Sequence, residues 1–152
     1  MHNEIDTIAK EYDSPTNYLI VVDKKEHFVG IYEGGKGKWT RLHRWICSVG
    51  APESPTPSGS FLMGSYDGLP FHQKGFGLYE PDGTRAHCRW ATRITTNGFL
   101  FHSIIYAGES TQEYIYDGRL GEDVTHGCVR LHIENAKWIY DNIPESTRCV
   151  IY

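Results

Sequence analysis

The chain places apolar and polar residues in short alternating runs that are typical of β-strands. Residues 17–23 (NYLIVVD) and 27–33 (HFVGIYE) are two such runs, separated by the charged turn at residues 24–26. After the glycine-rich turn at residues 34–37, alternation resumes over residues 39–49. Period-two patterns bounded by turns predict half-buried strands. We therefore expect the chain to open with a meander of antiparallel strands.

The middle of the chain predicts further strands and three loops. Strands are expected at residues 60–65, 86–95 and 98–105, with a hairpin turn at Asn97-Gly98. The loop at residues 50–59 contains three prolines, which stiffen it. Residues 66–85 are rich in Gly and Pro and are expected to run irregularly over the surface. Residues 106–124 are polar and are expected to form a lid or binding loop.

The end of the chain carries one clear helix. Ala136, Ile139, Tyr140 and Ile143 repeat at the helical interval, and Pro144 ends the pattern. Residues 148–152 predict a closing strand, and residues 1–16 a leader or linker with one helical turn. The sequence thus predicts a mainly β domain over residues 17–152, with one clear helix near the C-terminus.

Length and charge exclude several classes of function. The 152 residues suit one domain, and the net charge of -4 argues against nucleic acid as a partner. No apolar run approaches the roughly 18 residues that span a bilayer, so no membrane insertion is expected. The polar start has no signal-peptide pattern, so the chain is either cytosolic or a piece of a longer secreted or anchored protein.

The four cysteines do not predict a disulfide framework or a metal site. No C-x-x-C pair occurs, and a reactive Cys128 leaves three cysteines that cannot all pair. Cys47, Cys88 and Cys149 lie in apolar runs and are expected in the core. A metal site built from Cys47, Cys88, His72 and His87 is disfavoured by their irregular spacing.

Cys128 is the strongest candidate for a nucleophile. It follows Gly127, which lets the backbone pass close to a substrate. A thiol reacts as thiolate and needs a basic or cationic neighbour. His126 lies two residues before it, His102 ends an apolar strand, and Arg130 adds positive charge. From these residues alone, a buried structural thiol is the commoner interpretation, and the choice of base stays open.

A family resemblance changes that balance. The segment 125–131 (THGCVRL) resembles the signature of the L,D-transpeptidase (YkuD-type) catalytic domain, and His102-Ser103 resembles its upstream histidine. Residues 118–121 (GRLG) and 54–61 (SPTPSGSF) are similar to two further family elements. The resemblance extends over residues 17–152 and implies the family's β-sandwich or mixed β fold.

The resemblance implies a mechanism without metal or cofactor. Cys128 is expected to attack a peptidoglycan stem peptide at the bond before its terminal D-Ala. His102 is the expected general base, oriented by the Ser103 carbonyl. The amides of His126, Gly127 and Cys128 are expected to form the oxyanion hole, with the His126 side chain shaping the pocket.

The expected partners are the stem peptides and a carbapenem that acylates Cys128. Thr125, Arg130 and Tyr106 are the candidate substrate-binding residues, although Arg130 could equally pair with an acidic residue of the fold. The family resemblance also implies a location outside the cytoplasm.

One departure and three alternatives accompany this hypothesis. Residues 103–124 separate His102 from Thr125, a longer interval than the family pattern has, and the excess is expected at residues 107–116 as an enlarged lid. The same scaffold could be an L,D-carboxypeptidase that trims the terminal D-Ala, or a catalytically silent wall-binding module. A papain-like protease is weaker, because its sequence signature is absent.

Overall fold

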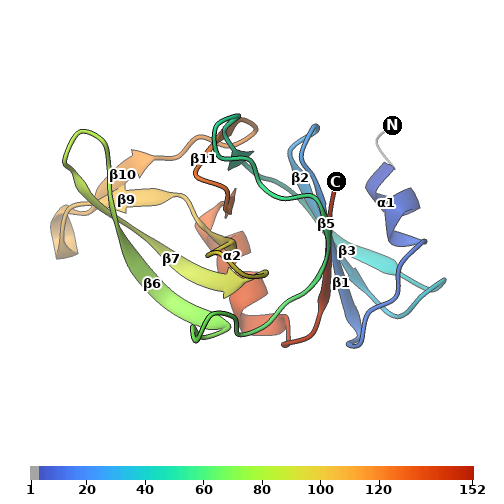
Figure 1. The fold of residues 1–152 in the computed structure, drawn as a ribbon. Coiled ribbons are helices and arrows are strands. Elements are labelled where there is room, and N and C mark those ends of the chain that lie inside the picture. The colour runs from blue at the N-terminus through green and yellow to red at the C-terminus, as the bar shows by residue number, and fades with distance from the viewer. Residues whose placement is uncertain (1–3) are drawn as a thin grey trace.

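The computed structural model describes residues 4–152, except for the side chain of Ser110. Two large sheets stand side by side, with one helix between them and another on the outer face of the first sheet (Figure 1). A third sheet consists of two short strands, residues 49–50 and 123–125. The elements follow in the order α1 (Glu4–Ala9), β1 (Tyr18–Asp23), β2 (Phe28–Glu33), β3 (Thr40–Ile46), β4 (Val49–Gly50), β5 (Gly59–Leu62), β6 (His72–Tyr79), β7 (Arg85–Arg93), β8 (Leu100–Ser103), β9 (Ile105–Ala107), a 3-10 turn (Ser110–Gln112), β10 (Tyr114–Asp117), β11 (Asp123–Thr125), β12 (Val129–Leu131), α2 (Ile133–Asn142) and β13 (Arg148–Ile151). The predicted mainly β class is confirmed.

The first sheet has the strand order β3-β2-β1-β13-β5. Strands β1, β2 and β3 form the predicted antiparallel meander, and β13 runs parallel to β1. Strand β1 is buried on both faces, because Ile20 and Val22 join the main core while Leu19 and Val21 pack with Ile5 of α1. This double burial explains its nearly continuous apolar sequence.

The second sheet positions the candidate site. Strands β10, β9, β7, β8 and β12 follow one another, and β6 pairs with the outer side of β7. Strand β12 runs parallel to β8, so that Arg130 lies opposite His102. Phe101 and Leu131 face the core, where Ala136 of α2 packs. His102 and Arg130 face the other way, into a pocket.

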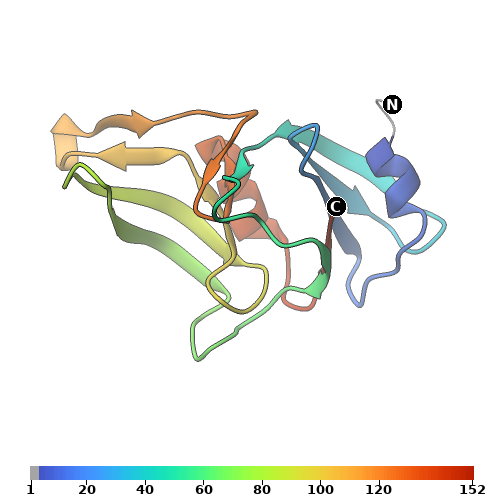
Figure 2. The same cartoon turned by 45° about the horizontal axis from the view of Figure 1, so that its top comes forward.

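Helix α2 contains Ala136, Ile139 and Tyr140 of the predicted helical pattern, ends one residue before Ile143, and lies between the two large sheets (Figure 2). Its buried residues Ala136 and Ile139 repeat at the helical interval, and Ile143 follows them into the core. The prediction from periodicity and Pro144 is therefore confirmed. None of the helices formed by residues 4–152 is long and apolar enough to cross a membrane.

Two segments that were expected to be loops are hairpin strands instead. Residues 66–85 contain β6, and residues 106–124 contain the end of β9, the 3-10 turn and β10. The sequence pattern did not predict β6, because β6 contains Gly75 and Gly77 and glycine disfavours strands. At Gly75 the reason for glycine is steric, since a Cβ atom would lie 3.0 Å from the carbonyl oxygen of Cys88. Strand β6 is stabilised by its pairing with β7, and this pairing cannot be predicted from the local sequence.

Candidate active site

The segment between β11 and β12 forms a tight turn that presents Cys128. Gly127 adopts a φ of +123°, a conformation that side chains other than glycine's strain to reach. A Cβ atom there would also lie 2.7 Å from the ring of Phe99. The glycine before the nucleophile is therefore required by both backbone geometry and space.

Thr125 holds this turn closed. Its hydroxyl donates to the carbonyl oxygen of Cys128 at 2.7 Å and accepts the amide N–H of Gly127 at 3.1 Å. The Gly127 amide, which the sequence predicts to be an oxyanion donor, is thus hydrogen-bonded within the turn. Thr125 was expected to bind substrate; it borders the pocket, but its hydroxyl is committed to the turn.

Thr56 fixes the turn from the proline-rich loop. Its buried hydroxyl donates to the carbonyl oxygen of Gly127 at 2.7 Å and accepts the amide N–H of Gly50 at 2.8 Å. Ser54 of the same loop donates to the carbonyl oxygen of Thr125 at 3.1 Å. The stiff loop predicted from its prolines is therefore the support on which the catalytic turn rests.

Cys128 is partly exposed and borders a pocket of about 310 Å³, which His102, His126 and Arg130 also line. Its Sγ donates a weak hydrogen bond to the carbonyl oxygen of Gly98 at 3.4 Å. Burial raises the pKa of the Cys128 thiol to about 11, and the Leu100 amide and nearby arginines oppose this rise. This candidate nucleophile is therefore a neutral thiol at rest, and a neutral thiol needs a base to react.

His102 lines the same pocket and is the candidate for that base. It is 5% exposed, and its Nδ1 lies 2.7 Å from the carbonyl oxygen of Ser103, the contact expected from the sequence. A carbonyl only accepts, so Nδ1 carries the proton and Nε2 keeps its lone pair. Burial lowers the pKa of His102 to about 4, which keeps the imidazole neutral. The ring of Phe76 meets it edge-on at 5.6 Å.

The Ser103 side chain faces away from the imidazole. Its hydroxyl donates to the carbonyl oxygen of Ile104 at 2.8 Å and accepts the amide N–H of Arg89 at 2.9 Å. Ser103 therefore orients His102 through its backbone, while its side chain joins β8 to β7.

Arg130 lines the pocket but is already paired. Its Nη1 lies 3.1 Å from a carboxylate oxygen of Asp117, at the end of β10. Arg119 also donates to Asp117, through Nε at 3.0 Å and Nη2 at 2.8 Å. Of the two roles left open for Arg130, pairing with an acidic residue is the one seen in the structure.

The structure places Tyr106 apart from these residues. It does not line the Cys128 pocket; its ring stacks on His87 at 6.2 Å, and the guanidinium of Arg89 lies 5.3 Å from its centre. Glu113 binds both His87 and Arg89, and so fastens the 3-10 turn to β7. Tyr106 belongs to this ionic cluster rather than to the candidate active site.

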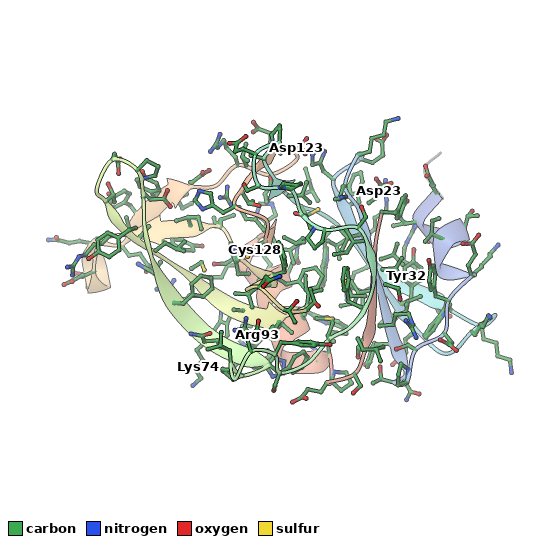
Figure 3. All side chains as sticks on the ribbon, in the orientation of Figure 1. Asp23, Tyr32, Lys74, Arg93, Asp123 and Cys128 are labelled. Carbon is green, nitrogen blue, oxygen red and sulfur yellow. The ribbon has the colours of Figure 1, made fainter. Side chains whose placement is uncertain are left out.

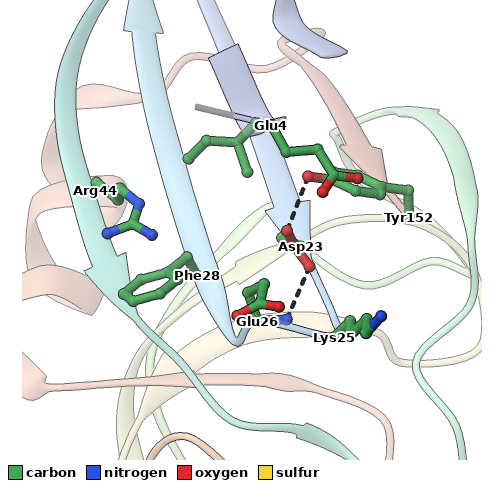
Figure 4. A pocket seen from close by; sticks show the side chains of 8 residues that line it. Glu4, Asp23, Lys25, Glu26, Phe28, Arg44 and Tyr152 are labelled. Carbon is green, nitrogen blue, oxygen red and sulfur yellow. Dashed lines mark hydrogen bonds between the residues drawn. The ribbon is translucent and has the colours of Figure 1, made fainter. Parts of the chain in front are cut away.

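A larger cavity of about 480 Å³ lies at the other end of the molecule, beside α1 (Figure 4). Its buried carboxylate, Asp23, accepts the hydroxyl of Tyr152 and the amide N–H of Glu26, both at 2.9 Å. Among the described residues 4–152, no cysteine or histidine lines this cavity. Within residues 4–152, no three His, Cys, Asp or Glu side chains are grouped to hold a metal ion.

Comparison with known proteins settles the family. A family model described as the L,D-transpeptidase catalytic domain (YkuD) matches residues 17–151. The chain belongs to this family. YciB of Bacillus subtilis is 32% identical over 135 residues, which are 87% of this chain and 64% of that protein. L,D-transpeptidase 1 of Mycobacterium tuberculosis is 32% identical over 105 residues, 67% of this chain and 39% of that protein. The chain thus spans less than two thirds of these relatives.

Solved structures share the L,D-transpeptidase fold. A fused Zn-dependent amidase/peptidase/peptidoglycan-binding domain-containing protein of Clostridium acetobutylicum is 29% identical, with a TM-score of 0.71 over 97% of this chain and 57% of that one. L,D-transpeptidase 3 of Mycobacterium tuberculosis, solved with a faropenem-derived adduct, is 24% identical, with a TM-score of 0.63 over 89% of this chain and 60% of that one. At that identity the second likeness concerns the fold alone.

Three residues at the L,D-transpeptidase site were missed from the sequence. In the sequence, Thr56 stands out only as part of the motif at residues 54–61, and Asp117 only as part of the polar segment at residues 106–124. Arg93 is a charged residue inside the apolar run 91–94 (ATRI), and a charge in a buried strand was the available signal. Thr56 binds Gly127, about 70 positions away in the chain, and Asp117 pairs with Arg130, 13 positions away. The sequence pattern does not predict contacts between such distant positions.

Proposed function

We propose that this chain is a cysteine-dependent L,D-transpeptidase that acts on peptidoglycan stem peptides and uses Cys128 as its nucleophile. The observation that carries the proposal is the placement of Cys128 and His102 in one pocket, with His102 held by the Ser103 carbonyl so that Nε2 remains basic. Membership of the family supplies the class of reaction.

The neutral thiol and neutral imidazole define the first step. Cys128 Sγ attacks the carbonyl carbon before the terminal D-Ala as its proton passes to His102 Nε2. Oxygen gains the negative charge, and the amides of His126 and Cys128 are the donors nearest the nucleophile that the turn leaves available. The intermediate then collapses to a thioester, and His102 returns the proton to the departing D-Ala amine.

A second stem peptide completes the transfer. Its side-chain amine attacks the thioester, His102 takes the amine proton, and Cys128 leaves as thiol after reprotonation. The product is a 3-3 cross-link between two diamino-acid residues. Because this substrate lies outside the cytoplasm, we place the enzyme there as well.

The test is incubation of the protein with a disaccharide tetrapeptide, with products identified by mass spectrometry. Dimers that have lost one D-Ala support transfer, whereas tripeptide alone identifies an L,D-carboxypeptidase. The Cys128→Ala variant is the control and should give neither product. Imipenem, which is found in complex with a related L,D-transpeptidase, should add its mass to Cys128. If neither product nor adduct forms, the remaining interpretation is a catalytically silent wall-binding module.

A further inference from the structure

Arg93 lies at the same level of the second sheet as the nucleophile. It ends β7 and pairs with Leu100 of β8. Val129 pairs with Phe101 in the next strand, so Cys128 lies beside Leu100. Figure 3 shows Arg93 and Cys128 together in the middle of the molecule, away from Asp23 and Tyr32 of the first sheet.

The guanidinium of Arg93 is buried without a counter-ion. The residue is 3% exposed, and its Nε donates to the carbonyl oxygen of Pro70 at 3.0 Å. Its amide N–H donates to the carbonyl oxygen of Phe71 at 2.8 Å, which fixes the backbone. Among residues 4–152, no carboxylate pairs with Arg93, and its Nη1 and Nη2 are not among the buried side-chain atoms that lack a partner, so they keep some contact with solvent. A nearly buried charge without a counter-ion is costly, so its retention calls for a reason.

We propose that Arg93 is a positioning residue of the active site whose positive charge stabilises the thiolate of Cys128. The inference rests on the proposed function in one respect, namely that Cys128 is the nucleophile. A cation held by Pro70 and Phe71 at the level of a sulfur that acquires charge during catalysis is preorganised, and in a nearly buried position it is screened less than a cation on the open surface.

Comparison with Arg130 supports this assignment. Both arginines lower the pKa of Cys128, in opposition to the effect of burial. Arg130, however, is paired with Asp117 at 3.1 Å, so much of its field at the sulfur is offset. Arg93 has no such partner and is the uncompensated cation of the site.

Other titratable groups also contribute to the electrostatic environment of Cys128. They are His102 from β8, Cys88 from β7, Arg130 from β12, His126 from the turn, and Glu80, Asp117 and Arg119 along the pocket. None of them is altered in the variants below, so a change in Cys128 reactivity reports on position 93.

The experiment measures alkylation of Cys128 by iodoacetamide as a function of pH, with peptide mapping and Cys128→Ala as the background. Arg93→Gln removes the charge but keeps a donor for the Pro70 carbonyl, and Arg93→Lys keeps the charge. Arg44→Gln is the matched control, because Arg44 is a partly buried arginine on β3 of the first sheet, stacked 3.5 Å over the ring of Phe28.

We expect Arg93→Gln to slow alkylation about tenfold throughout the range below the thiol pKa, as a rise of about one pKa unit requires. Arg93→Lys should recover most of this loss, and Arg44→Gln should match the wild type. Equal rates for Arg93→Gln and wild type, or an equal loss in the glutamine and lysine variants, would overturn the inference. If Arg93→Gln does not fold, Arg93→Met supplies the same comparison.

Alkylation requires no peptidoglycan, so the two proposals fail separately. A tenfold shift in a protein that forms no cross-links would refute the transpeptidase but retain the role of Arg93. If both cross-linking and alkylation are unchanged in Arg93→Gln, the role of Arg93 is refuted and the transpeptidase is retained.

Discussion

Asp117 and Arg130 form an ion pair, with 3.1 Å between Oδ1 and Nη1, that joins the β9–β10 hairpin to the strand following the nucleophile. Arg130 is nearly buried, and it sits opposite His102 across the β8–β12 pairing. The hairpin expected to form a lid is therefore coupled to the catalytic strand through a charge that needs its partner.

Removing the carboxylate should destabilise the protein. In Asp117→Ala, Arg130 remains buried without its counter-ion, and we expect a loss of about 3 kcal/mol in the free energy of unfolding, measured by urea denaturation. Asp141→Ala is the control, because it breaks only the exposed pair between Asp141 and Lys137, where little change is expected. Equal losses in the two variants would contradict this account.

The same ion pair predicts a pH dependence. Hydrogen bonds from Arg119, with help from Arg130, lower the pKa of Asp117 from 3.8 to about 2. A carboxyl whose pKa is lower in the folded state stabilises it above the unfolded pKa, and this contribution is lost as the pH falls through the folded value. The wild type should lose its advantage over Asp117→Asn between about pH 4 and pH 2 in urea titrations. A constant difference across this window would argue against the pair.

The pH profile of acylation should identify the base. Burial lowers the pKa of His102 to about 4. At pH 5 about nine tenths of such an imidazole is neutral, against about one thirtieth for an ordinary histidine. We expect the rate of imipenem acylation to stay flat from about pH 8 to pH 5 and to fall only near pH 4.

His102→Gln should abolish this acylation, whereas His126→Ala should keep the wild-type pH profile because its imidazole is exposed in the pocket wall. A rate that disappears in His126→Ala would transfer the role of base to His126.

Thr56 should matter for catalysis although it lies outside the signature. Thr56→Val removes the hydrogen bonds to Gly127 and from Gly50, at an expected cost of about 2 kcal/mol in stability. The catalytic turn should loosen, and kcat/KM for the tetrapeptide should fall with it. Thr56→Ser keeps the hydroxyl and should retain most of both properties. Activity lost equally in both variants would indicate a packing role for the methyl group.

Local sequence patterns were sufficient to predict several elements of the fold and the family of this protein. The periodicity of Ala136 and Ile139 predicted α2, alternation predicted the opening meander, and the segment around Cys128 identified the family. Each of these patterns is complete within a few consecutive residues, which is why sequence reasoning can reach it.

Tertiary structure decided what depends on distant partners. Strand β6, with Gly75 and Gly77, exists because β7 pairs with it, and Tyr106 faces His87 because of the register between β9 and β7. Arg130 was ambiguous until Asp117 was found beside it, and Arg93 was inconspicuous until the sheet brought it level with Cys128. The sequence by itself pointed to Cys128 as the candidate nucleophile; burial and pairing across strands decided the electrostatic environment of its thiol and its neighbours, because that environment forms only when remote segments meet.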